Sequence, residues 1–339
     1  MCTTIFLNEH GQRIVGKNLD IFLDSGCLFT NHRNMVKAAL IRPPEQPAAW
    51  VSVYGSITHC QSGKELPYGG INEAGLVVEQ MTLPDTRYPD VDVRPAVNEL
   101  QWIQYMLDTC ATVADVVETA QHIRISQTMS AVHYMACDRS GDAAVIEYIG
   151  GKMKLYTGAS LPMPLLTNSS YETALSHNGC AANDAPDIHG DNHDYERNSL
   201  QRFQRGAVVL GRPLVPEESI GQGFAALEAV KREDTVWSCV YDLDSLQVHF
   251  RTNRYPDIRS FQLQDFDFEA GAQPLALDVC AHATGGIAEF VPYRRELNRE
   301  LIEPLFRHPM IMSMFPYTLT DDDIELMSSY PEMMEPAQP

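Results

Sequence analysis

The chain has 339 residues, of which 44% are hydrophobic, so it can bury a large core in one large domain or two. Its 45 acidic and 25 basic residues give a formal net charge of −20. This charge argues against nucleic acid or an anionic membrane surface as a partner, because both bind basic faces. The sequence has no apolar run of about 18 residues and no basic segment followed by an apolar one at its start. We therefore expect no nucleic-acid partner, no membrane insertion and a cytoplasmic location.

The eight cysteines are spread at wide intervals and form no C-x-x-C pair. This spacing favours neither a disulfide scaffold nor a zinc ribbon. We expect most of them to be ordinary buried thiols, and we expect no metal and no other cofactor.

Cys2 stands directly behind the initiator methionine. Removal of that methionine would place a thiol and a free α-amino group on one carbon. The amine has a reference pKa of about 7.7 to 8.0 and the thiol of about 8.5, so near neutral pH the amine can act as the base for the thiol. Taken alone, however, a second residue belongs more often to a frayed terminus.

The residues after Cys2 predict a hairpin. A β-branched and aromatic run from Thr3 to Leu7 is followed by a glycine-containing turn and by a second strand that ends at Asp20. The terminus is then part of a sheet, with Cys2 fixed at a strand start. The returning strand brings Lys17 and Asp20 back toward the thiol and the amine.

The remaining pattern predicts sheets packed between helix layers, an α+β fold. Strand-like runs fill 27–84, 131–156 and 164–170, and a hairpin is expected over 235–252. Helical periodicity covers 97–121, where Thr112 and Asp115 form a capping signal, and also 200–210, 217–230 and the residues from 285 to about 306. We expect a mobile surface loop at 172–197 and an acidic, loosely held tail at 320–339, after a single domain over 1–319.

Six short motifs occur in a fixed order along roughly residues 2–270. They are Cys2-Thr3-Thr4, Gly16-Lys17-Asn18-Leu19-Asp20, Gly70-Ile71-Asn72-Glu73-Ala74-Gly75-Leu76, Leu166-Thr167-Asn168-Ser169, Gln201-Arg202-Phe203 and Val240-Tyr241-Asp242. Together they resemble the choloylglycine hydrolase and penicillin V acylase family, linear amide C–N hydrolases of the N-terminal nucleophile superfamily. The resemblance implies a four-layer αββα sandwich with two mainly antiparallel sheets.

The resemblance also implies roles for residues at matching positions. It makes Cys2 the nucleophile, Asp20 the carboxylate that holds the α-amino group, Asn168 the side-chain donor to the oxyanion, and Arg202 a supporting arginine. Thr82 falls where the family places a variable residue whose backbone N–H completes the oxyanion hole. Lys17 departs from the pattern, since that position is usually arginine; lysine keeps the charge but loses the bidentate fork.

Other interpretations of these residues remain open. Asp20 could form an Asx turn at a strand end, and Asn168 could be a turn residue or the asparagine of a glycosylation sequon. Arg202 could be an ordinary arginine on a helix surface. A second candidate site is a loop whose side chains are of the types that bind metals: Asp184, Asp187, His189, Asp191, His193 and Asp194. A hydrated acidic loop that binds no metal is the simpler explanation of this composition. The other alternative is a binding or scaffold protein of the same fold that lacks turnover.

The resemblance implies a small-molecule N-acyl amide as the substrate and a homodimer or homotetramer as the assembly. Bile-salt conjugates, phenoxyacetyl penicillins, N-acyl homoserine lactones and other N-acyl amides all present an apolar acyl group, and the sequence does not rank them. Selectivity is expected in four loops, at 22–27, 54–60, 81–82 and 128–133.

Overall fold

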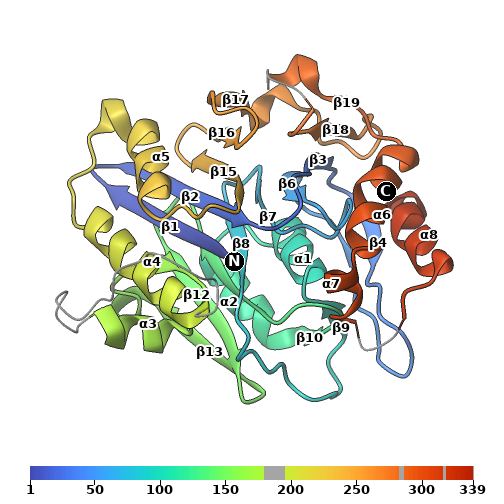
Figure 1. The fold of residues 1–339 in the computed structure, drawn as a ribbon. Coiled ribbons are helices and arrows are strands. Elements are labelled where there is room, and N and C mark those ends of the chain that lie inside the picture. Colours follow the sequence, from blue (N-terminus) through green and yellow to red (C-terminus); the bar gives the residue numbers. More distant parts are fainter. Residues whose placement is uncertain (179–194, 282–285, 316–317, 339) are drawn as a thin grey trace.

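The structure is a computed structural model that describes residues 1–178, 195–281, 286–315 and 318–338 (Figure 1). The metal-ligand type loop at 184–194 lies outside these residues. Among the described residues, no helix is both long and apolar enough to cross a membrane.

The first of two large sheets contains the predicted N-terminal hairpin at its centre. The sheet has six strands in the order β14-β1-β2-β15-β16-β17, and every pairing is antiparallel. Its strands are β1 (Cys2–Glu9), β2 (Gln12–Asp20), β14 (Leu165–Leu166), β15 (Thr235–Asp242), β16 (Gln247–Thr252) and β17 (Arg259–Gln262). The chain start is therefore held between β14 and β2, as a strand inside a sheet.

The second sheet has nine antiparallel strands in the order β13-β12-β11-β8-β7-β6-β3-β18-β19. They are β3 (Cys27–Asn31), β6 (Ser56–Cys60), β7 (Gly69–Asn72), β8 (Val77–Thr82), β11 (Val132–Cys137), β12 (Ala143–Ile149), β13 (Lys152–Thr157), β18 (Leu275–Asp278) and β19 (Val291–Pro292). Strand β8 faces β1 of the first sheet. The predicted meander over 131–156 forms β11, β12 and β13.

Two small sheets lie outside these layers. One pairs β9 (Ala96–Asn98) with β10 (Arg124–Ser126) in parallel, and the other joins β4 (Met35–Ala38), β5 (Ala49–Val51) and β20 (Glu335–Pro336). Short 3₁₀ turns occur at Gly158–Ser160, Pro216–Glu218, Leu263–Asp265, Ile287–Glu289 and Tyr330–Met333.

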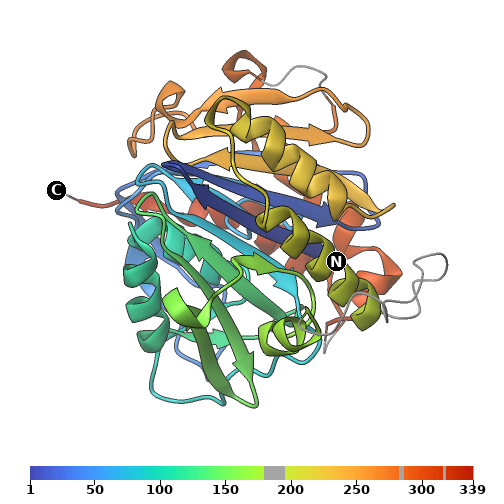
Figure 2. The ribbon, with the colours of Figure 1, turned by 90° about the vertical axis from the view of Figure 1, so that its left-hand side faces the viewer.

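Helices cover the outer face of each large sheet. On the first sheet, α4 (Tyr195–Leu210) packs on β1 and α5 (Ser219–Ala229) packs on β2 and β15, with α3 (Tyr171–Asn178) beside α4 (Figure 2). On the second sheet, α1 (Gln101–Thr109) packs on β7 and β8, and α2 (Val113–His122) on β11 and β12. The layer order is helix, sheet, sheet, helix, which confirms the predicted αββα sandwich.

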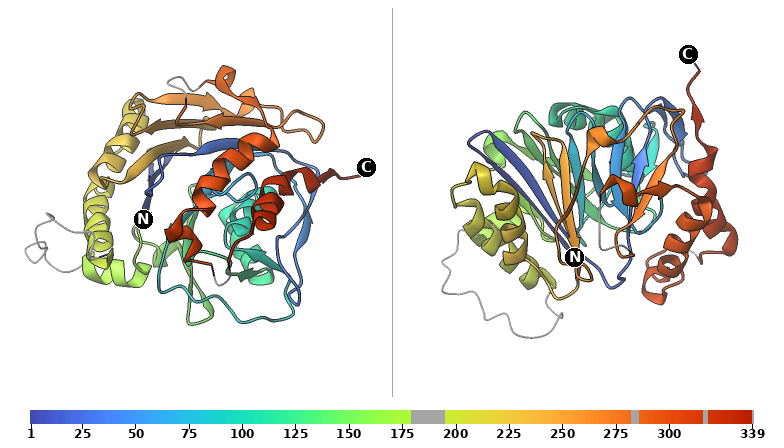
Figure 3. Two further views of the ribbon diagram at one scale, coloured as in Figure 1. Left: turned by 45° about the vertical axis from the view of Figure 1, so that its right-hand side comes forward. Right: turned by 90° about the horizontal axis from the view of Figure 1, so that it is seen from above.

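Two segments differ from the sequence-based expectation. The predicted loop at 172–197 is helical at both ends, because α3 occupies its start and α4 begins before its end. The predicted loose tail is ordered over its described part: α8 (Asp321–Ser329) packs on α6 (Arg295–Phe306) and β20 pairs with β4. These helices and α7 (Pro309–Met312) lie on the opposite side of the molecule from α4 and α5 (Figure 3). Ile324 and Tyr330 are buried and hold this segment in place. The sequence-based prediction gave more weight to its acidic residues and prolines than to these apolar side chains.

Candidate active site

Cys2 lies at the first position of β1, where its thiol faces the second sheet. Cys2 pairs with Leu19 of β2 and is only 4% exposed. The next residue, Thr3, points the other way and its hydroxyl accepts a hydrogen bond from Arg202 of α4 at 2.5 Å. Thr4 again faces the second sheet and donates to the sulfur of Met81 at 3.0 Å. The alternation of side chains along a strand therefore places the Cys2 thiol between the two sheets.

The Asn168 side chain joins Cys2 to the end of β8. Its Oδ1 accepts hydrogen bonds from the backbone nitrogen of Cys2 at 2.9 Å and from Arg202 Nη2 at 2.7 Å. Its Nδ2 donates to the carbonyl oxygen of Thr82 at 2.8 Å. These contacts fix the orientation of the amide. An amide nitrogen carries two hydrogens, so one remains to donate to a further acceptor.

Thr82 presents its backbone toward Asn168. It is the last residue of β8, and the neighbouring Leu83 donates its N–H to Ala131 beside β11. Because successive residues of a strand turn their backbone groups to opposite sides, the N–H and the carbonyl of Thr82 both point away from β11. The carbonyl meets Asn168 and also accepts from the Tyr195 hydroxyl at 3.2 Å. The Thr82 N–H thus points to the same side as the Asn168 amide.

The guanidinium group of Arg202 is buried and donates hydrogen bonds to several parts of the site. Its Nη1 donates to the carbonyl oxygen of Cys2 at 2.8 Å, and its Nε donates to Asn198, one turn earlier on α4, at 2.9 Å. Burial lowers the pKa of the guanidinium to about 10, while the nearby Asp20 carboxylate acts in the opposite direction. A bidentate group that is fully buried fixes the positions of Cys2 and Asn168 relative to the helix layer.

Asp20 lies beside the start of the chain. Its backbone oxygen accepts from the terminal nitrogen of Met1 at 2.8 Å, and its Oδ1 accepts from the Thr235 hydroxyl at 2.6 Å. Its Oδ2 is buried and has no hydrogen-bond partner among the described residues, with Arg232 Nε at 3.9 Å. Burial raises the pKa of this carboxyl, although the charge of Arg202 opposes the shift. An open carboxylate oxygen next to the chain start is suited to accept a hydrogen bond from an ammonium group.

Lys17 points into the space between the sheets. Its ammonium donates to the carbonyl oxygen of Gln80 and lies 3.3 Å from Glu79 Oε2. Its cation is therefore bound to groups of β8. The sequence places it on the strand next to Cys2, but only the structure shows that its polar partners come from the second sheet.

Two tyrosines near Cys2 were missed by sequence reasoning. Burial raises the pKa of Tyr68 and of Tyr195, and both lie close enough to Cys2 for a thiolate there to raise the pKa further. Tyr195 begins α4, seven residues before Arg202 and therefore close to the same helix face. This seven-residue spacing could have indicated that Tyr195 lies near Arg202. The sequence-based prediction missed it because it assigned 172–197 to a loop.

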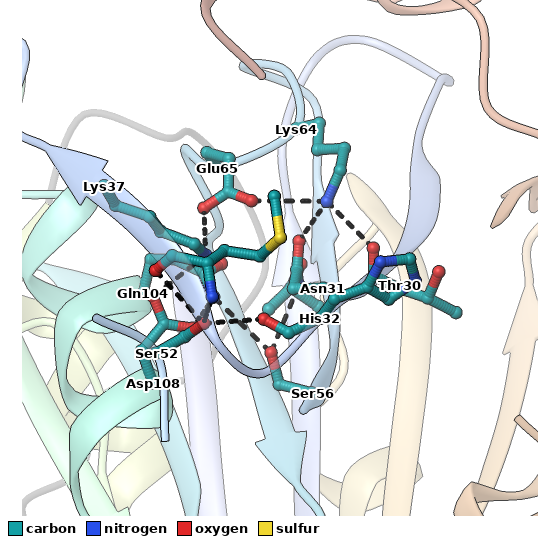
Figure 4. Close-up of polar contacts among 12 residues, drawn as sticks. Thr30, Asn31, His32, Lys37, Ser52, Ser56, Lys64, Glu65, Gln104 and Asp108 are labelled. Atoms are coloured by element: carbon teal, nitrogen blue, oxygen red, sulfur yellow. Dashed lines mark hydrogen bonds and ion pairs between the residues drawn. The ribbon is translucent and has the colours of Figure 1, made fainter. Parts of the chain in front are cut away.

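A separate buried ion cluster holds the segment that precedes Tyr68. Lys37 Nζ lies 2.7 Å from Glu65 Oε2 and 2.9 Å from Asp108 Oδ2. Lys64 Nζ donates to the Thr30 carbonyl at 2.8 Å and lies 3.3 Å from Glu65 Oε1 (Figure 4). Two lysines and two carboxylates balance each other here, as buried charges require. The cluster ties 64–65 to β3, β4 and α1.

Two of the cavities between described residues are large enough to hold part of a small ligand. The larger, about 530 Å³, opens beside the far end of β1, with Leu7, Asn8 and Glu9 in its wall. The smaller, about 210 Å³, is mainly apolar and lies between 39–42, Leu66, Met129 and the C-terminal helices. Leu66 and Met129 belong to the same hydrophobic cluster as Cys2 and Tyr68. Of the two, the smaller has Thr128 and Met129 in its wall, from the 128–133 loop in which selectivity is expected, although neither cavity is lined by Cys2, Thr82 or Asn168.

A match to a family model identifies the class of protein to which this chain belongs. Residues 2–213 match the linear amide C–N hydrolases, choloylglycine hydrolase family. The chain belongs to this family of hydrolases, which act on carbon–nitrogen bonds other than peptide bonds in linear amides. The match covers more than half of the chain and includes every proposed site residue.

Individual relatives support the assignment. A penicillin V acylase of Pectobacterium atrosepticum is 24% identical over 260 residues, which is 65% of this chain and 69% of that protein. Among solved structures, the penicillin V acylase of Agrobacterium tumefaciens has a TM-score of 0.72 at 23% identity, covering 87% of this chain and 98% of the other. A mutant conjugated bile acid hydrolase of Clostridium perfringens has a TM-score of 0.65 at 15% identity, covering 85% and 99%. At these identities the structural likeness shows the shared fold.

Proposed function

We propose that this protein is an amidohydrolase that uses Cys2 as an N-terminal nucleophile and cleaves a linear amide through a thioester acyl-enzyme. The main support is the position of Asn168, whose oxygen accepts from the Cys2 nitrogen while its nitrogen meets the backbone of Thr82. One side chain thus connects the nucleophilic residue with a second donor. An attack on an amide carbonyl needs this pairing of nucleophile and oxyanion donors.

In the first half-reaction, the α-amine of a mature Cys2 removes the thiol proton. The thiolate attacks the amide carbonyl carbon, and the resulting oxyanion accepts hydrogen bonds from Asn168 Nδ2 and the Thr82 N–H. The α-ammonium then protonates the leaving nitrogen and the C–N bond breaks, which leaves a thioester. One oxyanion donor contributes about 10²- to 10³-fold to such a step.

In the second half-reaction, the α-amine removes a proton from water. The water oxygen attacks the thioester carbonyl, the same donors stabilise the oxyanion, and the C–S bond breaks to release the carboxylate and restore the thiol. Arg202 acts as a positioning residue, because it holds the Cys2 carbonyl and the Asn168 oxygen. Asp20 would receive a hydrogen bond from the ammonium on its Oδ2, a role supported by the lack of any other hydrogen-bond partner for that oxygen among the described residues.

The proposed substrate is a small N-acyl amide with an apolar acyl group. The cavity of about 210 Å³ has a mainly apolar wall that includes Leu66 and Met129, and Met129 belongs to the 128–133 loop in which selectivity is expected. A hydrolysis screen over bile-salt conjugates, penicillin V, N-acyl homoserine lactones and N-acyl amino acids would identify the substrate.

The test combines intact mass with thiol titration. We expect the active protein to lack Met1, because an acylated Cys2 nitrogen has no basic lone pair. Iodoacetamide near neutral pH is expected to modify one thiol per chain in proportion to the loss of amide hydrolysis. Burial raises the pKa of the Cys60 thiol to about 12 and that of Cys239 as well, so neither should compete.

Single cysteine-to-alanine variants distinguish an enzyme from a binding or scaffold protein. Cys2→Ala should abolish both the titration and the turnover with little change in melting temperature, whereas Cys60→Ala and Cys239→Ala should retain substantial activity. Active protein that retains Met1 would contradict the self-base mechanism. A titrated thiol without hydrolysis of any amide in the screen would instead indicate a binding protein.

A further inference from the structure

A buried polar cluster connects the two sheets behind the proposed site. Lys17 of β2 and Glu79 of β8 are both fully buried, and their charged atoms lie 3.3 Å apart. Glu79 Oε1 also lies 2.9 Å from His59 Nε2 of β6 and accepts from the Tyr241 hydroxyl of β15 at 2.7 Å. One carboxylate therefore binds three side chains, two of which come from the first sheet.

The space around this carboxylate is closely fitted. A Cβ added at Gly69 would lie 2.1 Å from Glu79 Oε2, so the glycine leaves room for the carboxylate. Burial opposes the ionisation of Glu79, but the charges of His59 and Lys17 together hold its pKa below the ordinary value. The ionised Glu79 and the cation of Lys17 carry opposite charges, so this pair by itself is neutral, and a protonated His59 would add one positive charge beside it.

Lys17 also binds the backbone of the strand that leads to the site. Its ammonium donates to the Gln80 carbonyl and lies 3.4 Å from the Met81 sulfur, just before Thr82. On its own sheet, Lys17 pairs with Thr4, two residues from Cys2 on the same face of β1. The side chain thus spans from the strand pair that carries the nucleophile to the strand that carries a proposed oxyanion donor.

We infer that Lys17 and Glu79 form a neutral positioning pair, which sets the end of β8 relative to Cys2 and does not ionise the thiol. This inference rests on the proposed function and deepens it. Under it, the cysteine's own amine is the base, and Lys17 acts only through Gln80 on the placement of the Thr82 N–H. Lys17 is accordingly a positioning residue.

The test is the double variant Lys17→Met with Glu79→Gln. It removes the cation and the anion of the pair together, so neither is left buried without the other, and both side chains keep about the same length. We expect kcat for amide hydrolysis to fall by about 10-fold or more, since misplacing an oxyanion donor weakens transition-state binding. The pH midpoint of the iodoacetamide reaction should stay within about 0.3 unit of wild type, because alkylation needs the thiolate and no oxyanion hole.

Two outcomes would overturn the inference. A cation that stabilised the thiolate directly would lower its pKa by about 1 to 3 units, so its removal would raise the alkylation midpoint by at least about 1 unit. An unchanged kcat would show that the pair is not needed for positioning. Failure of the proposed function is distinguishable, because wild-type protein would then show no hydrolysis linked to a titrated thiol.

Controls separate positioning from loss of folding. Arg13 on the same strand β2 lies 2.5 Å from Asp244, and Arg13→Met with Asp244→Asn should leave kcat and the alkylation midpoint unchanged. If the double variant unfolds, the buried cysteines that are free in wild type also become reactive, so more than one thiol per chain is modified. Tyr241→Phe then serves as the milder test: it removes one hydrogen bond to Glu79 and should lower kcat several-fold without a change in the midpoint. Wild-type kcat in this variant would also overturn the inference.

Discussion

At the residue scale, Asn168 has the chemistry that its position requires. Its oxygen accepts from two donors, Cys2 N and Arg202, and its nitrogen faces an acceptor, the Thr82 carbonyl. An aspartate would satisfy the first two contacts but would place a carboxylate oxygen against the Thr82 oxygen. The side-chain amide is therefore the group of this size that fits both sides.

The first prediction compares two substitutions of Asn168. Asn168→Ala should lower kcat by about 10²-fold, or about 2.7 kcal/mol, with a smaller change in KM, because the donor matters most once charge has built up on the oxygen. Asn168→Asp should be worse, since it exchanges the donor for a negative charge that faces the developing oxyanion. Steady-state kinetics at neutral pH measure both.

A steric explanation predicts the reverse order of these variants, because aspartate nearly keeps the size of asparagine. If the aspartate variant retains more activity than the alanine variant, Asn168 is a structural residue and other groups must stabilise the oxyanion.

At the element scale, helix α2 shows how a local signal determines a helix start. Thr112 accepts from the Asp115 N–H at 3.2 Å, and the Asp115 carboxylate accepts from the Thr112 N–H at 2.9 Å and from the Ala111 N–H at 3.0 Å. This capping box was predicted from the sequence, and the structure confirms it. It fixes the helix that supports β11 and β12.

The second prediction concerns this cap. Partial burial opposes ionisation of Asp115, but its hydrogen bonds with Thr112 and Ala111 lower the pKa of the carboxyl. Asp115→Ala removes these hydrogen bonds and should reduce the free energy of unfolding by about 1 kcal/mol at pH 7. A lowered pKa in the folded state gives stability that is present above the unfolded value of about 3.9 and is lost as the pH falls through the folded value.

Urea unfolding of wild type and variant at pH 7 and pH 3 measures the effect. The difference between the two proteins should narrow at the lower pH. An equal difference at both pH values would mean that the aspartate acts without its charge.

At the scale of the whole molecule, the C-terminal segment belongs to the folded unit. The Tyr330 hydroxyl donates to the Ala38 carbonyl at 2.6 Å and accepts from Gln101 Nε2 at 2.8 Å. Asn298 of α6 donates to the Ser328 carbonyl at 3.0 Å. The segment 318–338 therefore closes over α6, β4 and the start of α1.

The third prediction is that deletion of 320–339 lowers the melting temperature and the soluble yield, because it uncovers the apolar face of α6. The matched substitution Tyr330→Phe keeps the ring and removes the hydroxyl, so it should cost about 1 kcal/mol. Thermal unfolding measures both. A truncated protein that melts like wild type would show that the segment is dispensable, as the sequence had suggested.

The sequence by itself determined the features that depend on interactions between residues close together in the chain. A β-branched and aromatic run with a glycine turn predicted the hairpin β1–β2, and a capping pair predicted α2. The family resemblance, carried by the order of the motifs, brought Cys2, Asn168, Arg202 and Thr82 into one hypothesis. The structure brings the last four together through direct hydrogen bonds. Periodicity and motifs succeed here because the physical causes lie within a few residues of each other.

Only the tertiary structure decided what faces each polar group. Lys17 meets Gln80, 63 residues away, and Tyr195 meets Thr82 from 113 residues away. The tail was expected to be loose because its acidic residues are visible in the sequence, whereas the partners of Tyr330 are hundreds of residues away on β4 and α1. Such contacts depend on how the sheets and helices pack, because a buried charge or hydroxyl takes the partner that the opposing layer presents.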